Sequence, residues 1–190
     1  MLAQIGSIVV NFIGSFFVVM LLIRFYFQWL RVPFRNQVGE FVIATTNWAV
    51  MPARKLIPSL FGADLASWAC AWLLQASVLA LLLVFGGRDL SSAPGIAAGL
   101  LLTLALVDLI ELSVKILLFV VILQAALSWL SPGNPLQYVL DSVTRPMLRP
   151  IRRLVPPIAN VDMSPFVLIL LLLVLLVPIA ELRQLAMGIF

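Results

Sequence analysis

The chain has 190 residues, of which 63% are apolar and only 11% are charged. Soluble domains carry roughly 45–50% apolar and about 25% charged residues, and no soluble fold of this size could bury so much apolar surface. We therefore expect a membrane protein. With no His and a single Cys, one chain cannot form a zinc site, a haem site, a Cys–His pair or a Ser–His–Asp triad, and we expect neither enzyme activity nor a cofactor. The net charge of +4 is read as topology information, not as a sign of nucleic-acid binding.

Three apolar runs are long enough to cross a bilayer, which takes about 20 mostly apolar residues. The first, Ile5–Leu30, is interrupted only by Arg24. Since it has neither a basic leader nor a small-residue cleavage site, we expect a retained helix and not a signal peptide. The second run is Leu65–Phe85 and the last is Met163–Ala180.

The segment Gly95–Leu130 is longer than one span requires. A helix of that length would measure roughly 50 Å, whereas a bilayer core is about 30 Å thick. The segment therefore forms either one long helix that protrudes or kinks, or two short helices. Its three charges, Asp108, Glu111 and Lys115, fall on one helical face, and Glu111 with Lys115 makes an i,i+4 pair. This face is expected near the outer membrane surface.

Basic residues concentrate in two segments, 31–64 and 131–162, each with four Lys or Arg residues. Loops rich in Lys and Arg remain in the cytoplasm. If both segments are cytoplasmic, an even number of spans separates them. This favours one long third helix, four spans in all, and both termini on the outer side. Five spans would put one basic segment on the wrong side.

The two basic segments are copies of one another. Residues 52–58 read Pro-Ala-Arg-Lys-Leu-Ile-Pro and residues 150–156 read Pro-Ile-Arg-Arg-Leu-Val-Pro, and an Asp follows each six residues later. Thr46 and Thr144 match at the same offset of 98 residues. We therefore divide the chain into two repeats, 1–86 and 87–190, each with the order helix, basic loop, helix. With four spans, the repeats would be parallel and related by a pseudo-two-fold axis along the membrane normal.

The repeated pattern Thr-x5-Pro-x-Arg-[Lys/Arg]-x-x-Pro-x5-Asp resembles the YggT family of bacterial inner-membrane proteins, which has relatives in plastids. The resemblance covers nearly the whole chain, although the first copy departs from the pattern at Ser59 and at Ala66-Ser67. We therefore expect any shared function to reside in the second copy. The resemblance implies an inner-membrane location. It also implies a link to osmotic tolerance, ion homeostasis or, in plastids, membrane organisation, without a mechanism.

The candidate site consists of the repeated motif residues together with two further arginines of the second copy. They are Pro52, Arg54, Lys55, Pro58, Asp64, Arg145, Arg149, Pro150, Arg152, Arg153, Pro156 and Asp162. The basic residues either record topology alone or bind anionic lipid headgroups or an acidic partner. Arginine presents a planar fork that suits phosphate, and each basic group near an anionic membrane surface gains about 1 kcal/mol. The fixed spacing supports binding, because topology requires charge but not register.

A segment of mixed polarity precedes each basic motif: Val38–Val50 in the first copy and Leu136–Met147 in the second. We expect these segments to form amphipathic helices in the membrane interface. The proline-flanked stretches that follow should form a turn or a single helical turn, because proline cannot continue a helix interior. The alternative is a re-entrant hairpin, which the bilayer tolerates only where protein buries it or where it lines a water cavity.

Asp64 and Asp162 each stand just before an apolar helix. They are expected to cap that helix, either alone or while pairing with a motif Arg, and ion binding is a third interpretation. Arg24 precedes Trp29 by about 8 Å along a helix, so we expect it to snorkel to the cytoplasmic surface. Its repeat counterpart, Gln124, is uncharged, which argues against a symmetric charged site.

The sequence favours a non-enzymatic scaffold or assembly and stress-tolerance factor of the inner membrane, with its basic loops in the cytoplasm and its termini in the periplasm. The expected partners are the bilayer, anionic phospholipids, and a membrane protein or a second copy of the chain; nucleic acid is not among them. The alternative is a small oligomeric ion channel or transporter. It is weakened because four spans with so few buried polar groups make a poor pore within one chain.

Overall fold

The computed structural model describes residues 1–34, 36–57, 62, 64–87, 94–130, 135–155 and 162–188. Within these ranges the chain is all-helical, as predicted, with six helices and no strand. The helices are α1 (Leu2–Trp29), α2 (Gln37–Ala53), α3 (Leu65–Phe85), α4 (Pro94–Leu130), α5 (Pro135–Leu154) and α6 (Ser164–Met187).

Three helices, α1, α3 and α6, are long and apolar enough to cross a membrane. They match the three predicted apolar runs, and α3 has the predicted bounds. Helix α6 continues seven residues beyond Ala180, since Glu, Leu, Arg and Gln are good helix formers even where the apolar run has ended. Only 17–22% of the most apolar window of each helix is buried inside the protein. The remaining apolar surface therefore faces the surroundings, as expected for helices solvated by lipid.

Helix α4 is one continuous helix of 37 residues, which decides between the two alternatives for this segment. At 1.5 Å per residue it is about 55 Å long. It packs against α3 on its N-terminal half and against α6 along its length. The indole Nε1 of Trp72 on α3 donates to the carbonyl oxygen of Leu102 on α4 at 2.9 Å. This helix therefore joins the two halves of the chain.

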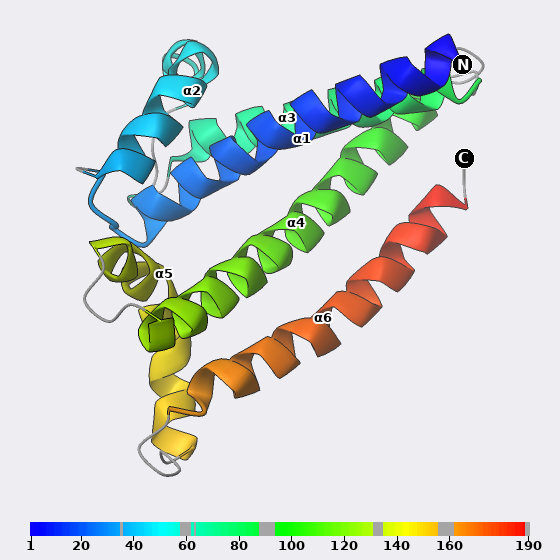
Figure 1. Cartoon of the computed structure of the whole chain (residues 1–190). Helices are drawn as coiled ribbons and strands as arrows, with labels where there is room; N and C mark the ends of the chain where they lie inside the picture. The colour runs from blue at the N-terminus through cyan, green and yellow to red at the C-terminus, as the bar shows by residue number, and fades with distance from the viewer. Residues whose placement is uncertain are drawn as a thin grey trace.

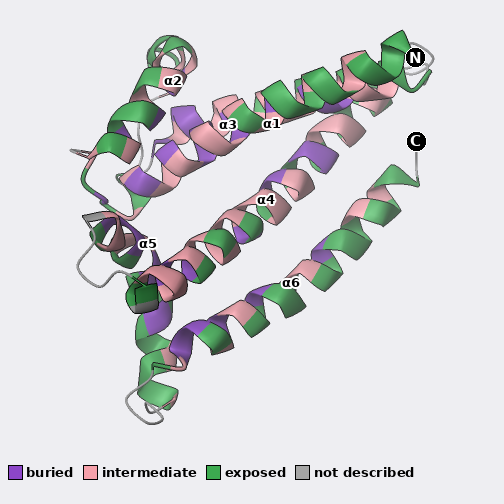
Figure 2. Cartoon of the chain, in the orientation of Figure 1, coloured by how far each residue is buried: buried purple, intermediate pink, exposed green. Residues whose placement is uncertain are grey.

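The long helices run side by side, and the two short helices lie across one end of them (Figure 1). Both chain termini lie at the opposite end. Buried residues line the facing sides of the helices, while exposed residues cover much of α6 and the N-terminal part of α1 (Figure 2). One core cluster is shared by α1, α2, α3 and α4, and a second by α4, α5 and α6.

Each short helix contributes one buried residue to one of these cores, and the two residues occupy equivalent positions in the two copies. Val50 of α2 and Leu148 of α5 are 98 residues apart in sequence, and both are 0% exposed. Thr46 and Thr144, one turn earlier, are also buried. Each segment is thus a helix that packs on the long helices of its own half. The expectation of an amphipathic helix is correct for α5 but not for α2, which is largely apolar and has no clearly separated polar face.

The expectation that the proline-flanked stretches form a turn or a single helical turn is correct only for the first copy. There α2 ends at Ala53, and the next residues form a turn. In the second copy α5 continues through Pro146 and Pro150 to Leu154, so Arg152 and Arg153 lie in its last turn. Both prolines are exposed. The carbonyl groups that lose their partners can therefore be solvated, which lowers the cost of proline inside a helix.

Helices α1 and α3 lie in close contact at Gly14, which is buried. A Cβ atom at this position would lie 2.3 Å from Cγ2 of Val78 on α3. Small residues allow such close contacts between membrane helices. At Gly99 of α4, by contrast, a Cβ would meet nothing within 4 Å.

We predict opposite effects for the same substitution at these two glycines. Gly14→Ala overpacks the α1–α3 contact, which costs about 1–3 kcal/mol, whereas Gly99→Ala gains up to about 1 kcal/mol of helix propensity. Thermal unfolding of the purified protein in detergent measures both. Equal melting temperatures for the two variants would contradict the close packing at Gly14.

Candidate functional site

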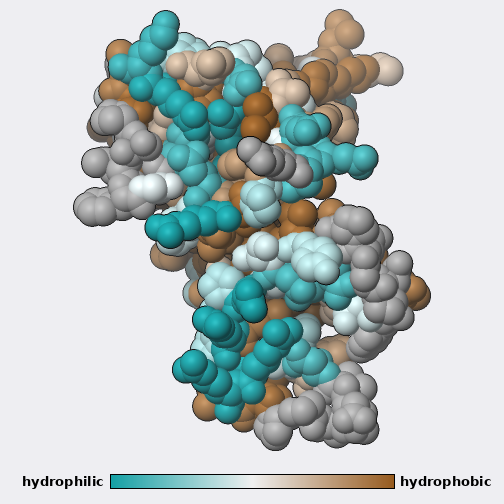
Figure 3. Space-filling model, turned by 90° about the vertical axis from the view of Figure 1, so that its left-hand side faces the viewer, coloured by the Kyte–Doolittle hydropathy of each residue, from teal (hydrophilic) through white to brown (hydrophobic). Residues whose placement is uncertain are grey.

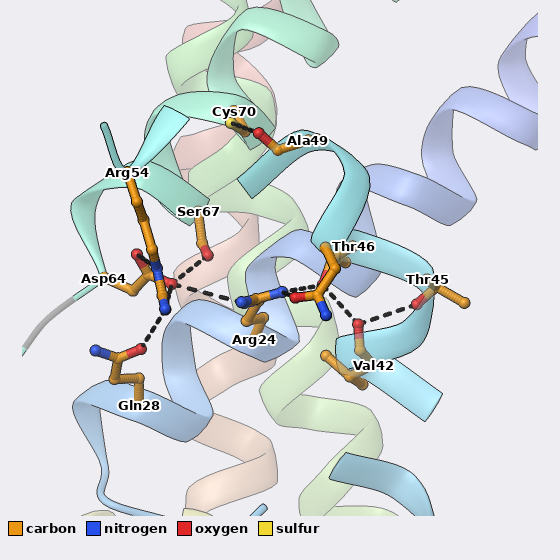
Figure 4. Close-up of polar contacts among 11 residues, drawn as sticks. Arg24, Gln28, Val42, Thr45, Thr46, Ala49, Arg54, Asp64, Ser67 and Cys70 are labelled. Atoms are coloured by element: carbon orange, nitrogen blue, oxygen red, sulfur yellow. Dashed lines mark hydrogen bonds and ion pairs between the residues drawn. The ribbon is translucent and has the colours of Figure 1, made fainter. Parts of the chain in front are cut away.

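A buried guanidinium group forms the centre of the first half of the chain. Arg24 on α1 is only 5% exposed. Its Nη1 donates to Oγ1 of Thr46 at 2.8 Å and to Oδ1 of Asn47 at 2.9 Å, both on α2. Its Nε lies 3.6 Å from Oδ2 of Asp64, which immediately precedes α3. One side chain therefore ties three helices together (Figure 4).

The expectation that Arg24 snorkels to the membrane surface is wrong. Snorkelling lets a long cationic side chain escape burial by reaching water. Here the acceptors lie within the protein, on α2 and beside α3, and the side chain remains buried among them. The sequence signal that could have indicated this is the set of polar residues at 46, 47 and 64, which lie close to Arg24 only after folding.

Asp64 receives several donors at once. Arg54 donates to its carboxylate from Nη2 at 2.5 Å and from Nε at 3.3 Å, and Ser67 Oγ donates at 2.6 Å. Arg54 also donates to Oε1 of Gln28 on α1, at 3.1 Å. Asp64 stands at the N-cap position of α3, but its side chain accepts from these side chains and not from the helix backbone. It pairs with the Arg of its own motif, one of the expected arrangements.

Burial alone would raise the pKa of the Asp64 carboxyl group. The hydrogen bonds from Arg54 and Ser67, with the positive charges of Arg54 and Arg24, outweigh that effect, so the pKa lies below its ordinary value. The carboxylate therefore remains ionised and holds the two arginines together.

The second copy repeats the Arg–Asp pair in a more exposed setting. Arg152 Nε lies 2.8 Å from Oδ2 of Asp162, and the two side chains are 49% and 43% exposed. The backbone N–H of Ser164 donates to Oδ1 of Asp162 at 2.9 Å, which is a cap-like contact at the start of α6. Burial tends to raise the pKa of Asp162, but the Ser164 contact and the Arg152 charge keep it below its ordinary value.

Gln124 of α4 takes the place that Arg24 has in the first copy. It is 6% exposed. Its Oε1 accepts from Oγ1 of Thr144 at 2.5 Å, and its Nε2 donates to Oδ1 of Asp141, both on α5. In both copies, therefore, a buried polar side chain of a long helix contacts the Thr of the short helix that matches at the offset of 98 residues. This polar side chain is charged in the first copy and neutral in the second.

Beside Gln124 lies a cavity of about 290 Å³ between α4 and α5. Its lining residues are Gln124, Tyr138, Asp141, Ser142, Arg145, Leu148 and Arg152. Two candidate residues, Arg145 and Arg152, therefore lie at one cavity, which the sequence did not predict because its polar partners come from α4 as well as α5.

The remaining basic candidates are exposed. Arg149 and Arg153 follow Arg145 at intervals of four residues on α5, and none of the three forms an ion pair or hydrogen bond within the described ranges. Lys55 is exposed in the turn after α2. Hydrophilic side chains gather at the end of the molecule where α2 and α5 lie (Figure 3). The prolines at positions 52 and 150 are exposed helix residues, while Pro58 and Pro156 lie outside the described residues.

A second polar cluster connects α3, α4 and α6. Arg183 of α6 lies 2.6 Å from Asp108 and 3.8 Å from Glu111, both on α4. Gln75 of α3 donates to Asp108 at 2.8 Å. The predicted pair of Glu111 with Lys115 is present, at 2.5 Å. Sequence reasoning missed Arg183 because it lies 75 residues from Asp108, beyond the last apolar run.

A family model described as CCB3/YggT matches residues 3–92 and 103–182 of the chain. The chain is 35% identical over 170 residues to "Uncharacterized protein YggT" of Escherichia coli strain K12, covering 88% of this chain and 85% of that protein. It is 32% identical over 165 residues to "Uncharacterized protein in proC 3'region" of Vibrio alginolyticus, with 85% and 86% covered. No solved structure matches it significantly.

The two motif aspartates allow a matched test of the buried network. Asp64→Asn removes the counter-charge of a buried Arg, and breaking a buried pair costs about 3–5 kcal/mol. Asp162→Asn breaks an exposed pair, which costs about 0–1 kcal/mol. Thermal unfolding in detergent should therefore show a large loss of stability for the first variant only. If both variants unfold at the wild-type temperature, the network does not stabilise the fold.

Proposed function

We propose that this chain, which belongs to the CCB3/YggT family, is a non-enzymatic, multi-pass protein of the bacterial inner membrane that binds anionic lipid through α5. In this role it is a membrane scaffold, with the first half of the chain as a rigid support. The family resemblance noted in the sequence agrees with the matches to the family model and to the bacterial relatives. The names of those relatives assign no activity, so the proposal rests on geometry.

The proposed arrangement has four spans: α1, α3, α4 and α6. The position of α2 and α5 at one end of the long helices, with both termini at the other end, supports it. Both basic motifs then face the cytoplasm, as the positive-inside rule requires. Since α4 is longer than a bilayer core is thick, it is either tilted or extends beyond the hydrocarbon region.

The observation that carries the proposal is the row of unpaired arginines on α5. Arg145, Arg149 and Arg153 are spaced by four residues, which places them on one face of the helix. The adjacent face is buried through Thr144 and Leu148. Helix α5 is thus fixed to the protein by one face and offers positive charge on another. Such a face suits the phosphates of a membrane surface, where each basic residue contributes about 1 kcal/mol.

Helix α2 offers a different surface. Phe41, Trp48 and Met51 are 52%, 63% and 64% exposed. Phe41 and Trp48 also contact the rings of Phe16 and Phe17 on α1, with ring centroids 6.4 and 5.7 Å apart. Exposed aromatic side chains, above all Trp, are enriched at membrane–water interfaces. We infer that α2 is held in the interface mainly by apolar contacts and α5 mainly by charge.

The channel alternative has less support. The charged groups on the long helices pair with one another: Arg24 with Asp64, and Arg183 with Asp108 and Glu111. Paired charges that bridge helices serve packing, and a conducting path would need further polar groups from other chains. Ion flux through liposomes containing the purified protein, above that of empty liposomes, would favour the channel.

We predict that Arg149→Gln/Arg153→Gln weakens binding of phosphatidylglycerol about tenfold or more, because two charge contributions of about 1 kcal/mol each are lost. Binding is measured on the purified full chain by native mass spectrometry, with phosphatidylglycerol and phosphatidylcholine of identical acyl chains.

The matched control is Arg149→Lys/Arg153→Lys, which keeps both charges and should keep the preference for phosphatidylglycerol. The proposal fails if the Gln variant retains the full preference for the anionic lipid. It fails equally if the Lys variant loses that preference, since charge would then not be the cause.

A further inference from the structure

We infer that the cavity between α4 and α5 binds a phosphoethanolamine group, with its phosphate at Arg145 and Arg152 and its ammonium at Asp141. The inference rests on the proposed function in one respect: α5 must lie at headgroup level. It goes beyond that function because it assigns a discrete site for a dipolar group, whereas the proposed surface recognises only negative charge.

The charges at the cavity suit a dipolar ligand. Arg145 has no partner among the described residues, while Arg152 already pairs with Asp162 at 2.8 Å. Asp141 contributes a carboxylate to the same cavity and is held by Gln124. The cavity is thus lined by an unpaired cation, Arg145, by Arg152, whose charge is balanced by Asp162, and by the carboxylate of Asp141. A simple anion would meet the repulsion of Asp141, whereas a group with a phosphate and an ammonium satisfies both signs.

The donors available also fit a phosphate. A guanidinium group offers several N–H donors in a planar fork that matches phosphate oxygens. Ser142 and Tyr138 add hydroxyl groups to the lining. The hydroxyl of Ser142 already donates to the Tyr138 carbonyl oxygen at 2.7 Å, so its oxygen can accept from an ammonium. The lining is therefore mostly polar, and Leu148, also on α5, contributes an apolar part.

The size of the cavity restricts the ligand to a small group. At about 290 Å³ it lies just below the usual range of small-molecule pockets, roughly 300–1,000 Å³. A headgroup fits such a volume, but the acyl chains of a lipid do not, so they must remain outside, in the bilayer.

Comparison of the two copies shows why the site belongs to the second. In the first copy the guanidinium of Arg24 is held between α1 and α2 by Thr46 and Asn47. In the second copy the shorter side chain of Gln124 forms hydrogen bonds with Thr144 and Asp141. At the position of Asn47, 98 residues on, stands Arg145, which points to no partner in the described chain. In the first copy the guanidinium group between the helices, that of Arg24, is thus bound by protein groups. In the second copy the guanidinium group of Arg145 is available to a ligand.

The test compares phosphatidylethanolamine with phosphatidylcholine on the full chain in neutral detergent, by native mass spectrometry. A trimethylammonium group cannot donate a hydrogen bond to Asp141, and a hydrogen bond to a charged group is worth about tenfold or more in affinity. We expect phosphatidylethanolamine to bind about tenfold more tightly. Asp141→Asn should abolish this difference, and Arg145→Gln should weaken binding of both lipids.

Glu40→Gln is the matched control, because it changes the net charge by the same amount at an exposed position of α2. It should leave the ratio of the two affinities unchanged. Equal binding of the two lipids by the wild-type chain would overturn the inference, as would a loss of selectivity in Glu40→Gln. Circular dichroism and size-exclusion profiles establish that the Asp141→Asn and Arg145→Gln variants remain folded, and Asn can still accept the hydrogen bond from Gln124.

Two further arms identify the source of the group and separate this inference from the proposed function. Soluble glycerophosphoethanolamine that binds as tightly as the lipid would assign a free metabolite, and much weaker binding would assign the lipid. The Arg149→Gln/Arg153→Gln variant should keep the preference for phosphatidylethanolamine over phosphatidylcholine while it loses the preference for phosphatidylglycerol. If that variant also loses the first preference, the site is not distinct from the charged surface and the inference fails.

Discussion

The buried guanidinium of Arg24 is the constraint on which the first half of the structure depends. Removing an isolated ion from water costs several kcal/mol even after relaxation, so this side chain can remain at 5% exposure only if its partners are in place. Those partners come from two other elements, α2 and the residue before α3. The helices must therefore adopt one mutual arrangement, in which Asp64 bridges Arg24 and Arg54. The duplicated Arg–Asp motif thus serves first to fix a short helix on the long ones.

The two copies share this arrangement of helices but differ in where their charged residues lie. Val50 and Leu148 anchor the short helices at equivalent positions, and both motifs keep an Arg–Asp pair ten residues apart. In the first copy Arg24 and Asp64 are buried and satisfied internally, together with the partly exposed Arg54. In the second copy the buried position holds the neutral Gln124, and the arginines lie on the surface or at a cavity. We accordingly expect the ion pairs of the first copy to contribute more to stability, and we propose ligand binding for the second.

Much of the helical framework could be predicted from the sequence, because apolar runs of about 20 residues and mixed-polarity segments are local signals. The bounds of Leu65–Phe85 and the pairing of Glu111 with Lys115 are examples. The site was less predictable, since it depends on contacts between distant residues. Arg24 meets Thr46 only through folding, and Arg183 meets Asp108 across 75 residues. The continuation of α5 past Pro146 and Pro150 was also not predictable, because a helix tolerates proline best where the side that carries it is exposed.

A double-mutant cycle between Arg24 and Asp64 tests the central claim most directly. The free energy of unfolding is measured by detergent titration in mixed micelles for the wild type, Arg24→Gln, Asp64→Asn and the double variant. The account predicts a coupling energy of about 0.5–3 kcal/mol, with the double variant less destabilised than the sum of the single variants. The same cycle between Arg24 and Asp162, which make no mutual contact, should be additive. Additive effects of Arg24 and Asp64 would contradict the claim that their contact holds the three helices together.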